Sequence, residues 1–316
     1  EAVRNTSFCK HPAILPYFTT FIDKEMEKMW TVTMPMRAGT CRKIMNDYFP
    51  DGFAEPVVAT ILVQVLRAII YMHENHMIHK YVWSRALFVK FLLGTTSKPK
   101  MDNIFSDVRA DNILMDFTGE IRVTGLRQMV SLAQHGAYVA SVFSRVGDNI
   151  EWAAPELMAQ NNNYDERADI YSFGITALEL AFNRTPFDGW PALKVLLSKL
   201  EYDCPGIDTD KAMSPSFYKL VKSCLRKDAS ERPSAQELMD HPFLKNARNA
   251  RYLELHVVKE SGLLHKHDQA LQAAGASAPQ SELGASRAGT LSRKLNQEQI
   301  EEGAEVHLEG GSEEAE

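Results

Sequence analysis

Two short stretches of this sequence hold residues whose types and spacing suit phosphate transfer. One is Asp107-Val-Arg-Ala-Asp-Asn112, which runs on into Ile113-Leu114, and the other is Ile121-Arg-Val-Thr-Gly-Leu-Arg-Gln-Met129. The first offers the carboxylate and amide oxygens that Mg²⁺-dependent phosphate chemistry uses. The second is typical of a β-hairpin end leading into a loop, and it contains no carboxylate. A phosphate-transfer site built from these stretches would lack its second metal-binding aspartate.

Short elements must position these residues. We expect a buried strand at Met29–Thr33, and a long helix that has Pro56 in its first turn. Asn112–Met115 and Ile121–Val123 are predicted to be two strands joined by the turn Asp116-Phe-Thr-Gly119. The nearly all-apolar run Asp169–Phe182 predicts a buried central helix. Amphipathic helices are expected near Ala192–Leu200, Ser216–Leu225 and Ser234–Asp240, and an apolar cluster at Ile14, Leu15, Tyr17, Phe18 and Phe21.

The composition allows a sizeable core, because 45% of the 316 residues are hydrophobic. The formal net charge of −6 is local, since eight of the 41 acidic residues lie after Gln297, where no Lys or Arg occurs. The remaining chain has 35 basic and 33 acidic residues, so charge does not indicate a nucleic-acid surface. The four scattered cysteines form no C-x-x-C pair and fit a reducing compartment.

The first residues show no signal peptide, and we expect no apolar run long enough to span a bilayer. We therefore expect a soluble intracellular protein of the cytoplasm, with the nucleus as an open alternative location. Because the chain begins at Glu1 within structured-looking sequence, we expect it to be a fragment. Beyond about Lys259 the composition shifts to Ala, Ser, Gly and Glu, which predicts a disordered tail with a short helix near Leu291–Glu302.

Five short motifs follow one another along the chain in an order that can be compared with known families. They are His79-Lys80, Asp107 to Asn112, Ala154-Pro-Glu156, Asp169-Ile-Tyr-Ser-Phe-Gly174 and Arg232-Pro233. Over about Lys10 to Leu244 this series resembles the large lobe of a eukaryotic protein kinase. The resemblance implies an α+β, kinase-like fold that consists mainly of the helical C-lobe. Residues 1–36 would be a remnant of the N-lobe and hinge, 37–246 the C-lobe, and 259–316 the acidic tail.

The resemblance also assigns roles to residues. Asp107 matches the catalytic-loop aspartate, Asn112 the asparagine that binds the second Mg²⁺, and Arg109 the position of a phosphate-contacting lysine. Thr33 falls at the gatekeeper, Met34 to Met36 form the hinge that would bind adenine, and Leu114 would form the adenine floor. For Met36 and Leu114, plain core packing is an equal alternative. The structural residues implied are His79, Glu156 paired with Arg232, and Asp169 as a buried anchor.

The family's metal-binding D-F-G begins about thirteen residues after its catalytic asparagine. Counting from Asn112 leads to Gly125-Leu126-Arg127, while Asp116 comes too early and sits in the hairpin turn. Glycine offers no side-chain oxygen and Arg127 would repel a cation, so Asn112 is the only metal ligand left by this comparison. We expect Mg²⁺ binding to be impaired or absent, while ATP binding stays open.

The substituted tripeptide points to a subfamily. Together with H-P-A-I-L-P-Y-F-T-T-F-I and Y-D-E-R-A-D-I-Y-S-F-G-I-T-A-L-E-L, Gly125-Leu-Arg127 resembles the STRAD adaptors, pseudokinases of the sterile-twenty kinase group. This implies a protein that binds and allosterically activates a serine/threonine kinase, liver kinase B, with a helical-repeat scaffold of the MO-twenty-five family. The family's Trp-Glu-Phe docking tail does not occur here. Because Asp107 and Asn112 are kept, the alternative is a weakly active ATP-dependent serine/threonine kinase.

An insertion separates the family's catalytic histidine from its aspartate. In the family a single residue separates the two, whereas here Lys80 and the 26 residues Tyr81–Ser106 lie between His79 and Asp107. We favour a retained intron, because Lys-Tyr-Val and Ile-Phe-Ser can be encoded by splice-like sequences and removal of these codons keeps the reading frame. An apolar insert also suits a catalytic loop poorly. The alternative is a genuine surface insertion.

Overall fold

The computed structural model describes residues 11–23, 28–74, 77–78, 108–125, 130–131, 149–158, 165–207, 210–265 and 268–269. Residues 1–265 form one compact unit and residues 266–316 a second. The expected helix near Leu291–Glu302 and the insertion Tyr81–Ser106 lie outside the described residues.

Small antiparallel sheets accompany the helices. The strands are β1 (Tyr17–Asp23), β2 (Lys28–Thr33), β3 (Gly39–Thr40), β4 (Met77–Ile78), β5 (Ile113–Met115), β6 (Ile121–Val123) and β7 (Val130–Ser131). They pair as β1-β2, β3-β5-β6 and β4-β7. The predicted α+β fold is confirmed, as are the two short strands joined by the turn at Asp116–Gly119.

Helices account for more of the described chain than strands do. They are α2 (Cys41–Tyr48), α3 (Glu55–Glu74), α5 (Pro155–Met158), α6 (Arg167–Phe182), α7 (Ala192–Glu201), α8 (Pro215–Cys224), α9 (Ala235–Met239) and α10 (Ala250–Leu253). Short 3-10 helices lie at η1 (Ala110–Asn112), η4 (Ala229–Glu231) and η5 (Leu244–Asn246), and η6 (Glu254–Lys259) is a π-helix. The sequence predicted α6 to α9 to within a few residues.

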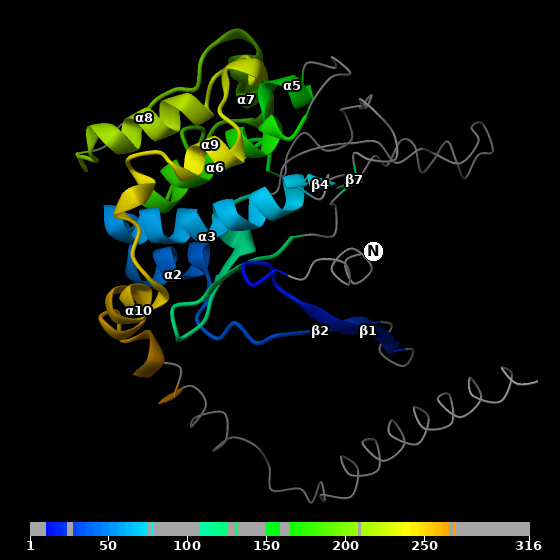
Figure 1. The fold of residues 1–316 in the computed structure, drawn as a ribbon, viewed down its shortest axis with the longest axis vertical. Helices are drawn as coiled ribbons and strands as arrows, with labels where there is room; N and C mark the ends of the chain where they lie inside the picture. The colour runs from blue at the N-terminus through cyan, green and yellow to red at the C-terminus, as the bar shows by residue number, and fades with distance from the viewer. Residues whose placement is uncertain are drawn as a thin grey trace, which may run out of the picture. The chain divides into compact units, whose positions relative to one another are not determined.

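Helix α3 lies in the middle of the helical part, between α6 and α9 on one side and the β5-β6 hairpin on the other (Figure 1). Its 20 residues are long and apolar enough to cross a membrane by length and composition, so the expectation that no such run exists was wrong. Two-thirds of its apolar window is buried inside the protein, however. The length and hydrophobicity of α3 therefore serve the core.

Helix α6 is buried along nearly its whole length, as predicted, from Ala168 to Phe182. It packs on α3 and α8. The contact with the end of α8 is close enough to require glycine, because a Cβ at Gly174 would lie 2.7 Å from Cys224 Cβ and 2.8 Å from Leu225 Cδ2. Any larger residue at position 174 would push α8 away from α6.

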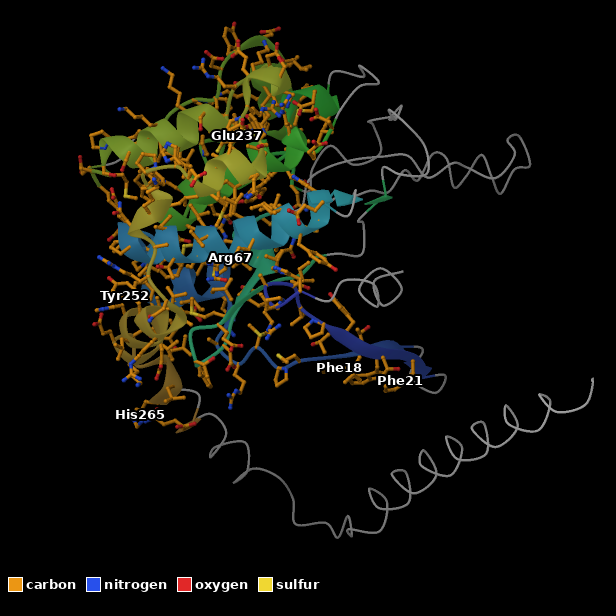
Figure 2. The ribbon with its side chains drawn as sticks, in the orientation of Figure 1. Phe18, Phe21, Arg67, Glu237, Tyr252 and His265 are labelled. Atoms are coloured by element: carbon orange, nitrogen blue, oxygen red, sulfur yellow. The ribbon has the colours of Figure 1, made fainter. Side chains whose placement is uncertain are left out.

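The β1-β2 hairpin does not bury its large apolar residues, contrary to the sequence prediction. Ile14 and Leu15 are buried, but Phe18 is 61% exposed and Phe21 is 53% exposed (Figure 2). On the partner strand, Trp30 is 48% exposed. The prediction failed because an apolar strand is buried only where another layer covers it, and within the described residues β1 and β2 pair only with each other.

The packed chain continues past the predicted start of the tail at residue 259. Val257 and Val258 in η6 are buried, and so is Leu263 beyond it. The boundary was set too early because a change of composition does not report these buried contacts.

Candidate functional site

The β5-β6 hairpin places Asn112 beside Gly125. In the strand register Ile113 is opposite Val123, and the Thr124 N–H donates to the Asn112 carbonyl oxygen over 2.8 Å. Gly125 follows directly, with a φ of +84°. The predicted metal ligand and the residue in the expected aspartate position are therefore neighbours across one hairpin, and position 125 offers no side-chain oxygen.

Asp116 lies at the opposite end of the same hairpin, in its turn. Its N–H donates to the Glu120 carbonyl oxygen, and its own carbonyl oxygen accepts from Gly119 N–H, both over 2.9 Å. The carboxylate accepts from Arg37 N–H at 3.1 Å and from Arg37 Nε at 3.2 Å. Asp116 is thus engaged with the segment before β3, at the far end of β5 from Asn112.

The turn also demands a glycine at position 119. Its φ is +77°, and a Cβ there would lie 2.0 Å from the Ala250 carbonyl oxygen. Asp116 and Gly119 therefore serve the hairpin and its contact with α10.

The residues that follow Asp107 are firmly held. Val108 and Ala110 are buried, and Asn112 N–H donates to the Arg109 carbonyl oxygen over 2.9 Å. Arg109 Nη1 lies 3.3 Å from Asp111 Oδ2, and its guanidinium carbon lies 5.9 Å from the ring centroid of Trp152. Asp107 itself lies outside the described residues.

The predicted gatekeeper is linked to the strand end near Gly125. Thr33 pairs with Tyr17 in the β1-β2 ladder, and the Tyr17 hydroxyl lies 2.9 Å from Thr124 Oγ1. The Thr33 hydroxyl donates to the Met34 carbonyl oxygen over 3.3 Å. Tyr17 therefore pairs with the predicted gatekeeper Thr33 and also contacts Thr124, the residue before Gly125.

The other predicted nucleotide contacts are half-buried. Met34 and Met36 follow β2, and the Met36 carbonyl oxygen accepts from Gly39 N–H over 3.1 Å. Leu114 is half-buried between the fully buried Ile113 and Met115. Because side chains alternate along a strand, Leu114 faces away from the core that its two neighbours fill.

A polar stripe on buried helix α6 supports the site, and the sequence analysis missed it. Thr176 Oγ1 donates to the Val108 carbonyl oxygen over 2.7 Å, and Ser172 Oγ donates to the Trp152 carbonyl oxygen over 2.7 Å. The Glu179 carboxylate accepts from Ala110 N–H at 2.9 Å and from Trp152 Nε1–H at 2.8 Å.

Glu179 is completely buried and also forms an ion pair with Arg42 of α2. Burial raises the pKa of Glu179, while Arg42 and the two N–H donors oppose that rise. The signal was present in the sequence, because polar residues at 172, 176 and 179 recur at helical spacing in an otherwise apolar helix.

Asp169 begins the same helix and is fully buried. Its Oδ2 lies 3.1 Å from His73 Nε2 of α3. Within the described residues no group of three or more His, Cys, Asp or Glu side chains gathers as a metal site would require. His79 lies outside them.

Glu156 and Arg232 form a two-pronged ion pair. Arg232 Nη1 donates to Glu156 Oε1 over 2.6 Å, and Nη2 donates to Oε2 over 2.8 Å. Arg232 is only 2% exposed, and its remaining donors reach the carbonyl oxygens of Arg226, Arg167 and Lys227. The pair fixes helix α5 to the loop before α9.

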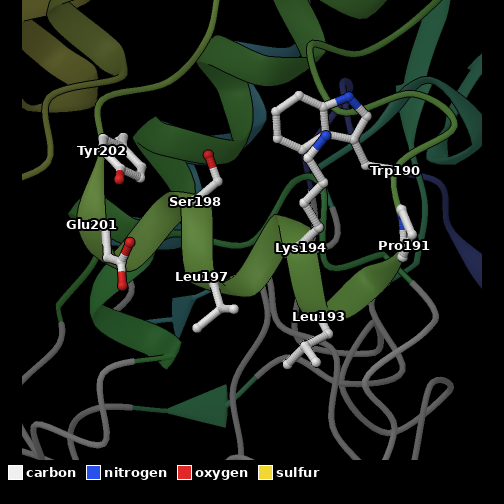
Figure 3. A pocket seen from close by; sticks show the side chains of 8 residues that line it. All are labelled: Trp190, Pro191, Leu193, Lys194, Leu197, Ser198, Glu201 and Tyr202. Atoms are coloured by element: carbon white, nitrogen blue, oxygen red, sulfur yellow. The ribbon is translucent and has the colours of Figure 1, made fainter.

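The outer face of α7 carries a shallow apolar groove (Figure 3). Its lining residues are Trp190, Pro191, Leu193, Lys194, Leu197, Ser198, Glu201 and Tyr202. Leu193 is 61% exposed, and Lys194 Nζ lies 3.8 Å from the Trp190 ring centroid. Lys199, on the inner face of α7, is buried instead and contacts three backbone carbonyls of the segment before α5.

The described residues offer few side-chain oxygens at the predicted metal position. In the described part of the site, Asn112 is the only residue that the sequence comparison assigned to a metal, and Gly125 beside it has no side-chain oxygen to offer Mg²⁺. The donor set present therefore does not fit the usual two-ligand arrangement. Glu156, Asp169 and Glu179 each have a protein partner within hydrogen-bond distance.

The chain that carries this geometry matches a known family model and is similar to several known proteins. Residues 100–244 match the family model of the protein kinase domain, and the match begins inside the stretch Tyr81–Ser106. Serine/threonine-protein kinase fray2 of Dictyostelium discoideum is 36% identical over 82% of this chain and 22% of its own length. Germinal center kinase 3 of Caenorhabditis elegans is 31% identical over 79% of this chain and 40% of its own.

Adapter proteins are also among the similar sequences. STE20-related kinase adapter protein alpha of Rattus norvegicus is 29% identical over 75% of this chain and 65% of its own length. The human STE20-related kinase adapter protein beta is 27% identical over 78% of this chain and 64% of its own. The chain spans less than two-thirds of the length of each of these relatives.

Proposed function

This chain carries a protein kinase domain related to STE20-type kinases and adapters, and from that premise we propose that it is a pseudokinase adaptor. One observation carries the proposal. Gly125 follows Thr124, which is hydrogen-bonded to Asn112, and it stands at the position that the kinase resemblance assigns to a Mg²⁺-binding aspartate. Protein kinase domains in general bind ATP with Mg²⁺. Without that carboxylate, Mg²⁺ binding would be impaired and phosphoryl transfer would be slow.

The scaffold around the site supports a role that depends on shape. The Glu156–Arg232 pair and the contacts of Glu179 join α2, α5, α6 and the residues after Asp107 through side-chain hydrogen bonds and ion pairs. Such a body can bind a partner and stabilise one of the partner's conformations. The proposed partner is a serine/threonine kinase of the liver kinase B type, with a helical-repeat scaffold of the MO-twenty-five family. The proposed location is the cytoplasm, with entry into the nucleus.

A weakly active serine/threonine kinase is the second candidate. The sequence keeps Asp107 and Asn112, and two of the similar proteins are named as kinases. In this alternative one metal, bound through Asn112, would support slow transfer.

Two assays on the full-length protein separate the candidates. The first measures transfer of labelled phosphate to a generic substrate protein with ATP and Mg²⁺, for the parent and for Asp107→Asn. The second measures peptide phosphorylation by liver kinase B and its scaffold with and without the parent protein. We expect no transfer above the Asp107→Asn background, and a rise in partner activity of about fivefold or more. Transfer that Asp107→Asn abolishes, or a partner that does not respond, would overturn the adaptor proposal.

A further inference from the structure

Lys199 of α7 places its ammonium group among three backbone carbonyls. Lys199 Nζ donates to the carbonyl oxygens of Ile150 at 3.0 Å, Glu151 at 2.6 Å and Ala153 at 2.6 Å. The side chain is 2% exposed. The ring centroids of Tyr171 and Phe187 lie 4.8 and 4.7 Å from the same nitrogen. All three protons of the ammonium group therefore have an acceptor.

The same short segment is held from its other side by α6. Ser172 Oγ donates to the Trp152 carbonyl oxygen, and Glu179 accepts from the Trp152 indole N–H. Together with the three carbonyls bound by Lys199, all four consecutive carbonyl oxygens from residue 150 to residue 153 accept a hydrogen bond from a distant side chain. The path of this segment into α5 is thus set by side chains of α6 and α7.

Burying the Lys199 ammonium group costs free energy, and only well-placed hydrogen bonds offset that cost. Burial lowers the pKa of Lys199 to about 7, because removing the ammonium from water disfavours its charged form. The charged or titratable side chains around it are Cys204, Glu151, Glu156, Arg232 and Tyr171. An apolar residue at 199 would avoid the burial cost but leave three carbonyls without their donor.

We infer that Lys199 is a positioning residue that fixes residues 150–153 against α7, so that its three N–H donors set the shape of the segment before α5. This inference deepens the proposed function and rests on it for its biological meaning. An adaptor that works by shape needs a segment ordered by its own side chains, and Lys199 supplies the donors on one side.

Hydrogen exchange of the full-length protein, without nucleotide or metal, tests the inference. The variants are Lys199→Met and, as the matched control, Lys194→Met, which removes an exposed lysine from the same helix. In Lys199→Met we expect exchange of peptides covering 149–158 to rise about tenfold or more, while peptides of α6 and α8 stay protected. Lys194→Met should exchange like the parent.

Chemical rescue distinguishes the effect of the Lys199 N–H donors from the effects of its side-chain volume and its charge. In Lys199→Ala, ethylammonium in the buffer should restore protection of residues 149–158, because it carries three N–H donors. Tetramethylammonium has the same charge but no donor, and should not restore protection. This comparison decides the matter even if Lys199→Met unfolds throughout.

Three results would overturn the inference: unchanged exchange in Lys199→Met, equal rescue by both cations, or no rescue by either. The partner assay distinguishes this failure from failure of the proposed function. If the parent protein activates its partner while hydrogen exchange of residues 149–158 is unchanged in Lys199→Met, only the inference fails. If exchange depends on Lys199 while no partner responds, the positioning role stands and the adaptor function fails.

Discussion

The indole N–H of Trp152 donates to the carboxylate of Glu179 over 2.8 Å, which joins the segment before α5 to the buried centre of α6. The same carboxylate receives Ala110 N–H and pairs with Arg42. One buried anion thus connects the residues after Asp107, the segment before α5 and helix α2. Such a junction can hold these three parts of the lobe in one arrangement.

Replacing Glu179 with glutamine should lower the free energy of unfolding by about 3–5 kcal/mol, because Arg42 would lose its counter-ion and an amide N–H₂ would face two N–H donors. Urea unfolding followed by circular dichroism measures the change. Glu201→Gln is the matched control, since Glu201 is exposed at the end of α7, and it should cost less than about 0.5 kcal/mol. Equal effects of the two variants would contradict the central role of Glu179.

Returning a carboxylate to position 125 should create Mg²⁺-dependent nucleotide binding. The expected readout for Gly125→Asp is a rise in melting temperature when ATP and Mg²⁺ are added together, larger than with ATP alone, since a ligand stabilises the state that binds it. The parent should show no such Mg²⁺ dependence.

Gly206→Asp is the control for added charge, because Gly206 has open space around its Cβ position. Aspartate at 125 must accept a positive φ, so a lower melting temperature without ligand is expected. A parent protein that already responds to Mg²⁺ would count against the impaired metal site.

The Arg37–Asp116 contact predicts a specific dependence of stability on pH. Burial alone would raise the pKa of Asp116, but hydrogen bonds from the Arg37 side chain and backbone outweigh it, so the pKa lies below the ordinary 3.8. A carboxyl with a lowered folded-state pKa adds stability above its unfolded pKa, and this stability is lost as pH falls through the folded value.

Asp116→Asn should therefore cost about 0.5–1 kcal/mol near neutral pH, a small effect because Arg37 is largely exposed. The difference from the parent should shrink as the pH falls toward about 3. Urea unfolding across this range checks both statements, with the exposed Asp188→Asn as control. A difference that stays constant with pH would mean that the Asp116 charge plays no part.

Sequencing of full-length transcripts tests the origin of Tyr81–Ser106. If these 26 codons are a retained intron, a spliced message lacking 78 bases should be found, with the reading frame kept. Its product would carry a single residue between His79 and Asp107. Transcripts that uniformly contain the 78 bases would establish a genuine insertion.

Local signals in the sequence determined much of this protein. The turn residues at 116 and 119 and the apolar run of α6 each act within a few residues, so spacing and composition predict them. Gly125 was picked out by counting from Asn112 along the spacing of the family it resembles, and the hairpin register places it next to Thr124, which is hydrogen-bonded to Asn112. The roles assigned to Asp107, His79 and Arg127 stay predictions, since these residues lie outside the described chain.

Only the tertiary structure decided which polar groups meet inside the core. The carbonyls bound by Lys199 lie 46 to 49 residues before it, and Ala110 lies 69 residues before Glu179. Exposure of Phe18 and Phe21 likewise depends on which layer covers β1, not on the strand itself. Propensity and periodicity describe one element at a time, whereas the partner of a buried charge is fixed by the path of the whole chain.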